Sequence, residues 1–246
     1  MEKEYQLVFS DTFDCEGAPD PLKWTHEIGA HRWGNKEQQY YTDRLVNCFV
    51  KDGVLTILAQ KEQMGNCEYT SARLMTYQKA SWQYGKFEIV AKLPKGKGSW
   101  PAIWMLSDAN KQKVKWPLCG EIDIMEHVGK NQDIVHFSLH TGTYNHFLGT
   151  HKTAIQKFDA VSDQFHTYGI EWDAGAISFS VDQIKVASFQ KESGDTESEW
   201  PFDQPFYLIM NIAVGGTWGG EIDESALPYR LEVKSVQVWQ KYKSFS

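Results

Sequence analysis

The sequence has few cysteines, no long basic run and no long apolar segment. Its four cysteines, Cys15, Cys48, Cys67 and Cys119, form no C-x-x-C pair, so their spacing does not indicate zinc. The sequence leaves open whether Cys48 and Cys67 form one disulfide or all four cysteines are free thiols. The 25 basic residues are outnumbered by 32 acidic ones, which gives a formal net charge of -7. This balance argues against nucleic acid as a partner and suits a neutral partner better.

The apolar segments are too short to span a bilayer, so no membrane partner is expected. The first ten residues, MEKEYQLVFS, lack the apolar core of a signal peptide. A removed signal peptide with an added initiator Met would leave the same beginning as a cytoplasmic start. We expect secretion, with the signal peptide absent from this sequence, while a cytoplasmic location stays open.

Aromatic and β-branched residues are abundant instead. Aromatic residues make up 14% of the chain and include ten Trp. Such side chains serve in the core of a sheet or as stacking platforms, for example for sugar rings. Short runs rich in these residues alternate with Gly, Pro and Asp turns, a pattern typical of β-strands. The runs occupy residues 54–59, 84–93, 167–172, 177–181, 205–214 and 231–240.

This pattern predicts an all-β protein, a two-sheet antiparallel sandwich. The chain shows no long amphipathic helix, internal repeat or low-complexity linker, and a short helix is expected only in 196–202 or 153–159. With 41% hydrophobic residues the chain can bury one sizeable core. We therefore expect residues 1–246 to form a single domain and the protein to be a monomer.

The segment GEIDIMEHVG places carboxylates at Glu121, Asp123 and Glu126. Side chains alternate along a strand, so Glu121 and Asp123 share a face, whereas Glu126 should point the other way. One extra residue around Ile124–Met125 would form a β-bulge and restore the parity. All three carboxylates would then project from one face.

Three carboxylates on one face repel one another, so their pKa values must split. An ionised nucleophile beside a protonated acid is what retaining glycoside hydrolysis requires, with carboxyl groups about 5–5.5 Å apart. A solvated acidic strand and a Ca²⁺ cluster are the alternatives that the spacing alone leaves open.

The motif and the segments around it resemble glycoside hydrolase family 16, in particular its laminarinase-type endo-β-1,3-glucanases. The resemblance is carried by GEIDIMEHVG, FSDTFD, HRWGNKEQQYYT, GKFEIVAKLPKGKGSWPAIWML, VHFSLH and MNIAVGGTWGG. It implies one catalytic domain, a concanavalin-like β-jelly-roll with an open concave cleft. It also implies endo-acting, retaining hydrolysis. By position, Glu121 matches the nucleophile, Glu126 the general acid/base, and Asp123 the carboxylate that orients the nucleophile and tunes protonation.

The resemblance further implies aromatic residues that bind sugar. Trp100 and Trp104 match the residues lining the subsites beside the scissile bond, with core packing as the alternative. Trp33 and Trp218 are expected to cap the cleft ends.

Polar residues of the cleft follow from the same resemblance. Asn35 and Arg73 match hydrogen-bonding residues on the glycone side, and a buried ion pair with a carboxylate is the alternative for Arg73. His140 matches a cleft histidine near the acid/base. His136 and His146 are expected to lie outside the site.

The chain departs from the family where other members hold Ca²⁺ on the convex side. Thr12 and Lys234 stand where acidic residues are usual. Calcium requires hard oxygen ligands, so the loss of a carboxylate and the gain of an ammonium disfavour it. Lys234 is expected to take the ion's place beside Asp11 or nearby carbonyls. We expect no metal and no cofactor.

The expected partner is a β-glucan polysaccharide or oligosaccharide. The resemblance predicts cleavage of β-1,3 linkages in laminarin-type glucans, or of β-1,4 linkages next to β-1,3 in mixed-linkage glucans, by double displacement through a glycosyl-enzyme. A galactanase such as an agarase is an alternative, although such enzymes usually carry more basic residues in the cleft. A non-catalytic β-glucan-binding lectin of the same fold is another, but lectins typically lack one or both motif glutamates.

Overall fold

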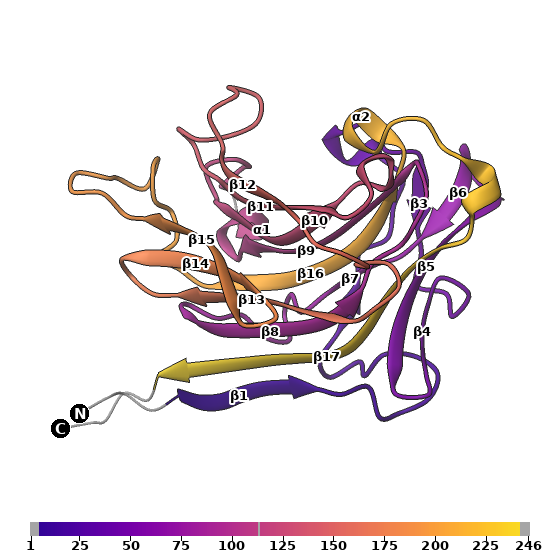
Figure 1. Cartoon of the computed structure of the whole chain (residues 1–246), viewed down its shortest axis with the longest axis horizontal. Coiled ribbons are helices and arrows are strands. Elements are labelled where there is room, and N and C mark those ends of the chain that lie inside the picture. Colours follow the sequence, from indigo (N-terminus) through magenta and orange to yellow (C-terminus); the bar gives the residue numbers. More distant parts are fainter. Residues whose placement is uncertain (1–4, 113, 242–246) are drawn as a thin grey trace.

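Two β-sheets packed face to face account for most of the protein (Figure 1). The computed structural model describes residues 5–112 and 114–241. Within them, the larger sheet has the order β15-β14-β13-β8-β17-β5-β6-β3, with β1 paired to β17 and β4 to β5. Its strands are β1 (Tyr5–Asp11), β3 (Gln39–Tyr41), β4 (Cys48–Lys51), β5 (Val54–Met64), β6 (Cys67–Ser71), β8 (Gly85–Lys92), β13 (His166–Trp172), β14 (Ala176–Val181), β15 (Ile184–Gln190) and β17 (Tyr229–Lys241).

The smaller sheet carries the acidic motif and has the order β12-β11-β10-β9-β16-β7-β2. Its strands are β2 (Thr25–His26), β7 (Arg73–Met75), β9 (Ser99–Ser107), β10 (Glu121–His127), β11 (Ile134–His140), β12 (Lys152–Lys157) and β16 (Phe206–Val214). The described helical segments are single turns in the connections: α1 (Ala109–Gln112), α2 (Gly216–Gly219), η1 (Arg32–Gly34), η2 (Gly129–Asn131) and η3 (Glu224–Ala226).

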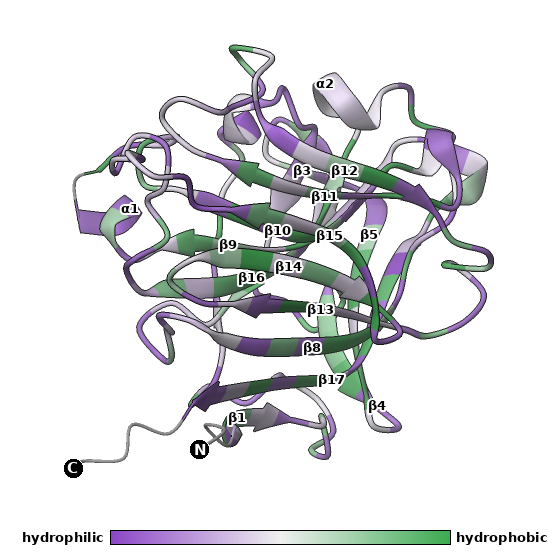
Figure 2. Ribbon diagram, turned by 60° about the vertical axis from the view of Figure 1, so that its left-hand side comes forward, coloured by the Kyte–Doolittle hydropathy of each residue, from purple (hydrophilic) through white to green (hydrophobic). Residues whose placement is uncertain are grey.

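The core lies between the sheets and is built by alternation. Along β8, Phe87, Ile89 and Ala91 are buried while the residues between them are partly exposed. Figure 2 shows the same alternation as hydrophobic and hydrophilic bands on β8 and β17. Strand β16 is buried along its whole length because it is central in the smaller sheet. Its residue Asn211 is buried by other side chains and forms hydrogen bonds with Trp104 and Tyr41.

All six predicted strand segments are strands in the structure. The expected helix is wrong at both positions: residues 152–157 pair with β11 as the edge strand β12, and 196–202 form turns and coil. Described strand pairs are antiparallel except β3 with β6, which run parallel. The four cysteines are free thiols. Among residues 5–112 and 114–241, no helix has the length and hydrophobicity to cross a membrane.

A lysine neutralises Asp11, but it is not Lys234. The Nζ atom of Lys23 lies 3.4 Å from Oδ1 of Asp11, and the indole of Trp24 donates a hydrogen bond to Oδ2 at 2.6 Å. Lys234 is exposed, and its Nζ lies 4.1 Å from the ring centroid of Phe165. The prediction that Lys234 takes an ion's place beside Asp11 is therefore wrong. Lys23, in the connection between β1 and β2, contacts the Asp11 carboxylate instead.

Candidate active site

Strand β10 contains the predicted bulge. On the β11 side, Asp123 pairs with Ser138 and Glu126 with His136, so Phe137 alone stands opposite two residues of β10. The register with β9 shifts at the same place, between Asp123 and Met125. Two residues facing one is the arrangement that defines a β-bulge.

The bulge returns Glu126 to the outward face of the smaller sheet. Ile124 and Met125 are both fully buried and belong to the core between the sheets. Glu121 and Glu126 remain partly exposed, whereas Asp123 is 2% exposed. If residues 121–126 formed a regular strand without a bulge, alternation would direct Glu126 into the apolar core. The three carboxylates therefore line one cleft, as the spacing predicted.

The electrostatics of the trio oppose full ionisation. Burial, followed by the negative charge of Asp123, raises the pKa of Glu121 well above its usual value. Burial and Glu126 likewise raise the pKa of Asp123 well above its usual value. Burial also raises the pKa of Glu126, against the opposing effect of a hydrogen bond from Trp100. The cleft thus favours a state in which at least one of the three carboxyl groups is protonated. A general acid must be protonated to act.

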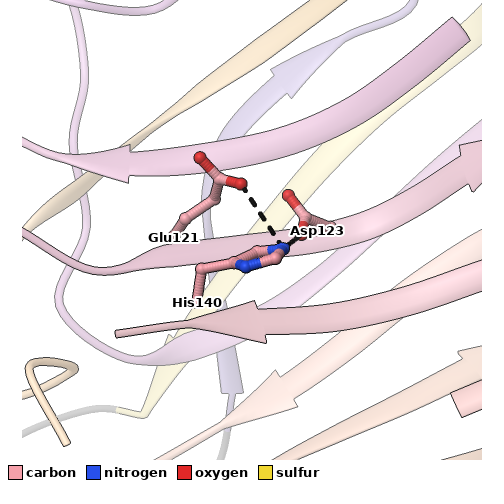
Figure 3. Close-up of side chains that lie close together, drawn as sticks. All are labelled: Glu121, Asp123 and His140. Atoms are coloured by element: carbon pink, nitrogen blue, oxygen red, sulfur yellow. Dashed lines mark ion pairs between the residues drawn. The ribbon is translucent and has the colours of Figure 1, made fainter. Parts of the chain in front are cut away.

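His140 projects from β11 toward the first two carboxylates (Figure 3). Its Nε2 atom lies 3.2 Å from Oδ2 of Asp123 and 3.8 Å from Oε1 of Glu121. Its side chain is 6% exposed, so water screens these contacts little. A proton on Nε2 would stabilise the ionised form of either carboxylate. The structure thus brings the predicted His140 against Glu121 and Asp123.

Trp100 and Trp218 form the wall beside Glu126. The indole nitrogen of Trp100 donates a hydrogen bond to Oε1 of Glu126 at 3.1 Å. Trp218, in α2, packs edge-on against Trp100 with ring centroids 5.3 Å apart and also contacts His136. Trp100 lines the cleft, whereas Trp218 is not among the lining residues. Trp218 is partly exposed and contacts Trp100, so it helps to hold that ring, while its expected role at a cleft end stays a prediction.

Arg73 lies at the opposite side of the cleft, on β7. Its Nε atom is 2.8 Å from Oε2 of Glu27, and its guanidinium is stacked between the rings of Trp33 and Trp104 at 4.6 and 4.7 Å. Burial alone would raise the pKa of Glu27, but Arg73 and Lys111 together hold it below its usual value. Arg73 forms the buried ion pair of the alternative interpretation and also lines the cleft, while its hydrogen bond to sugar stays a prediction.

The aromatic and polar partners of this side are held by a hydrogen-bond network. Trp104 donates from its indole to Asn211 at 2.8 Å, and Asn211 donates to the hydroxyl of Tyr41 at 3.1 Å. That hydroxyl donates to Glu37, which also accepts a bond from Asn35. The network fixes the plane of the Trp104 ring, and Asn35 lines the cleft as expected.

Trp33 is presented by an unusual backbone. Arg32, Trp33 and Gly34 have φ values of 62°, 48° and 78°, so the turn is left-handed. Non-glycine residues in that region are strained by ~1–3 kcal/mol each and concentrate at functional sites. The turn brings Trp33 over Arg73 and into the lining of the cleft, and its expected role in capping a cleft end stays a prediction.

The cleft has a volume of about 470 Å³ and includes residues that the sequence did not reveal. Trp116, His146 and Phe147 form an aromatic wall, with Trp116 5.0 Å from His146 and 5.3 Å from Phe147 between ring centroids. The expectation that His146 lies outside the site is wrong. These residues sit on connections, where no periodicity signals a shared surface. The other polar lining residues that were missed are Glu27, His31, Glu37, Asn110, Lys111 and Asn211.

Known proteins resemble this chain over nearly its whole length. A β-glucanase from Rhodothermus marinus is 51% identical over 244 residues, which cover 96% of this chain and 85% of that protein. The X-ray structure of the laminarinase from Rhodothermus marinus matches with a TM-score of 0.95 and 48% identity, covering 99% of this chain and 100% of the other.

A third relative is a mutant of a non-specific endo-β-1,3(4)-glucanase, co-crystallised with 1,3-β-D-cellotriosyl-glucose and presenting a 1,3-β-D-cellobiosyl-glucose at its active site. It matches with a TM-score of 0.93 and 39% identity, covering 97% of this chain and 95% of the other. The family described as glycosyl hydrolases family 16 matches residues 31–230, a range that contains all three carboxylates and most of the cleft. The chain therefore belongs to glycosyl hydrolases family 16.

Proposed function

We propose that the protein is an endo-acting, retaining β-glucanase that cleaves β-1,3 linkages, or β-1,4 linkages next to β-1,3. One observation carries this proposal: a bulge in β10 gathers Glu121, Asp123 and Glu126 in one cleft. Relatives at 39–51% identity bear the names β-glucanase, laminarinase and endo-β-1,3(4)-glucanase. Both glutamates are present, which disfavours a non-catalytic lectin.

In the first step, Glu121 attacks the anomeric carbon and the glycosidic C–O bond breaks. Glu126 gives its proton to the departing oxygen, so the leaving sugar departs as a neutral alcohol. Burial raises the pKa of Glu126, which favours the protonated form that this step uses. His140 and Asp123 border Glu121 and set the charge around it as it becomes an ester.

In the second step, Glu126 is a carboxylate and accepts a proton from water. The water oxygen attacks the anomeric carbon, and Glu121 departs as a carboxylate. Two inversions give net retention. Loss of the negative charge of Glu121 in the intermediate removes one repulsive partner of Glu126, which favours its conversion from acid to base.

Within the β-glucans, we favour linear β-1,3-glucan over mixed-linkage glucan. A sulfated or anhydro-galactan is disfavoured because the cations on the Arg73 side, Arg73 and Lys111, both pair with Glu27. The remaining lining is aromatic or neutral for most of its extent. Neutral rings with apolar C–H faces suit such a lining.

Product sizing on laminarin, barley β-glucan and agarose, side by side, tests the substrate. We expect a ladder of laminari-oligosaccharides from laminarin from the earliest times and no products from agarose. Proton NMR of a fresh digest should show the β-anomer first. Fastest release from agarose would contradict the proposal. Background release on every glucan with measurable binding would indicate the lectin instead.

A further inference from the structure

We propose that Glu121, Asp123 and His140 form a binding site for a borderline transition-metal dication, Zn²⁺ or Cu²⁺, and that its occupancy blocks hydrolysis. The ion would be an inhibitor of the site rather than a cofactor. The effect on activity rests on the proposed function, whereas the binding does not.

The donor atoms already lie close to the spacing that such an ion needs. One atom from each of the three side chains falls within a group whose members are all within 4.8 Å of one another. Two of the separations are 3.2 Å, between Nε2 of His140 and Oδ2 of Asp123, and 3.8 Å, between Nε2 and Oε1 of Glu121. Tetrahedral zinc, with bonds of about 2.0–2.2 Å to nitrogen and oxygen, separates its ligands by about 3.3–3.6 Å. A small rotation of Glu121 closes the difference.

One oxygen of the buried Asp123 carboxylate has no hydrogen-bond partner among the described residues. Asp123 is 2% exposed, and its Oδ2 accepts no hydrogen bond among the described residues, although it faces His140. Buried acceptors usually have a partner. A dication would supply one and would offset the repulsion among three carboxylates in one cleft. The backbone of β10 and its pairing with β11 hold the three ligands on rigid elements.

The donor set distinguishes between metals. One imidazole nitrogen and two carboxylates suit Zn²⁺ or Cu²⁺, whereas Ca²⁺ takes six to eight oxygen ligands and Mg²⁺ an octahedron of them. Three protein ligands leave a fourth position, which faces the cleft, for water. Coordination would engage the carboxylate of Glu121, the group that attacks the sugar in the proposed mechanism. Substrate and metal should therefore exclude each other.

Titration calorimetry with ZnCl₂ on the full chain, in a buffer that does not chelate, tests the binding. We expect one Zn²⁺ per chain, competition by laminari-oligosaccharide, and no heat from CaCl₂ or MgCl₂ at the same concentrations. Loss of an outer-shell partner alone weakens metal sites about 10–100-fold. Glu121→Gln and His140→Gln should therefore each lose at least about tenfold in Zn²⁺ affinity.

Glu126→Gln is the matched control, because it removes a neighbouring carboxylate that is not a ligand. We expect it to bind Zn²⁺ within a few-fold of the unmodified protein, although the Glu121 and Glu126 variants are both expected to be inactive. Near-UV circular dichroism should show that each variant is folded. In the unmodified enzyme, Zn²⁺ should raise the apparent KM for laminarin without changing kcat, and EDTA should reverse the effect.

Equal Zn²⁺ affinity in Glu121→Gln, His140→Gln and Glu126→Gln would overturn the site, as would absence of binding to the unmodified chain. Noncompetitive inhibition would place the ion elsewhere and also overturn it. If the ligand variants lose Zn²⁺ as expected but the metal-free protein hydrolyses no β-glucan, the site stands and the proposed function fails.

Discussion

The indole nitrogen of Trp100 and the carboxylate of Glu126 are joined by a hydrogen bond of 3.1 Å. This bond lowers the pKa of Glu126, whereas burial raises it, and burial prevails. A side chain expected to contact sugar thus also adjusts the group expected to protonate the leaving oxygen.

Trp100→Phe keeps an aromatic ring but removes the donor. The pKa of Glu126 should then rise further, and because a general acid works while protonated, the alkaline limb of the kcat/KM profile should move to higher pH. A hydrogen bond to a charged group contributes about 1.5 kcal/mol, so kcat/KM at the optimum should fall about tenfold. Trp104→Phe, which loses a bond to Asn211 instead, should leave the limb in place. A shift to lower pH in Trp100→Phe would contradict this account.

The roles of the outer glutamates can be separated with a small anion. Glu121→Gln and Glu126→Gln should each lose several orders of magnitude in hydrolysis. On a substrate with a good leaving group, azide should rescue Glu126→Ala and give the β-glycosyl azide, because the nucleophile remains. Glu121→Ala should give the α-azide by direct attack. The anomeric configuration, read by NMR, decides the matter, and the same product from both variants would overturn the assignment.

Deletion of Met125 should leave a regular strand. Phe137 of β11 would then face Ile124 alone, and Glu126 would stay on the cleft face. We expect reduced but measurable activity and a loss of about 2–5 kcal/mol of unfolding free energy, because a fully buried side chain is removed.

Deletion of Ile124 and Met125 together is the control for parity, since it turns Glu126 into the core. That variant should have no activity while near-UV circular dichroism still reports a folded protein. A single deletion that is folded and as inactive as the double would show that the bulge has another catalytic role.

The aromatic wall of Trp116, His146 and Phe147 should bind sugar on the aglycone side, if Asn35 and Arg73 hold the glycone. The side chain of Phe147 is 71% exposed and borders the cleft. Covering about 60 Å² of its apolar surface would contribute ~1.5 kcal/mol, so Phe147→Ala should raise KM for long laminari-oligosaccharides about tenfold. Shorter substrates that do not reach the wall should be unaffected. Equal effects on all lengths would contradict this placement.

Calcium should not stabilise the fold. Lys23, Trp24 and the backbone amide of Phe13 already satisfy the carboxylate of Asp11. After EDTA treatment the melting temperature should be unchanged, and added Ca²⁺ should not raise it. A ligand at 100 times its Kd would add about 2.7 kcal/mol, so a rise of several degrees would show a site that these contacts do not account for.

The sequence by itself determined the all-β fold and the parity of the acidic motif. Both depend on local alternation, because a strand presents every second residue to one face. With the spacing of Glu121, Asp123 and Glu126, the three carboxylates can share a face only if the strand contains a one-residue bulge. The apolar Ile124 and Met125 between them indicated which residues would turn to the core. The family resemblance then supplied His140, Trp100 and Arg73. The structure places Trp100 and Arg73 in the lining of the cleft and His140 against two of its carboxylates.

Only the tertiary structure decided which distant groups meet. Glu27, in the connection after β2, meets Arg73 of β7 and Lys111 of α1, and Lys23 rather than Lys234 reaches Asp11. Phe147 and Trp116 converge from two connections whose composition gives no periodic signal. Such contacts depend on how far each connection folds back over the sheet. Charge and aromaticity alone make several partners equally favourable, and packing of the two sheets selects one.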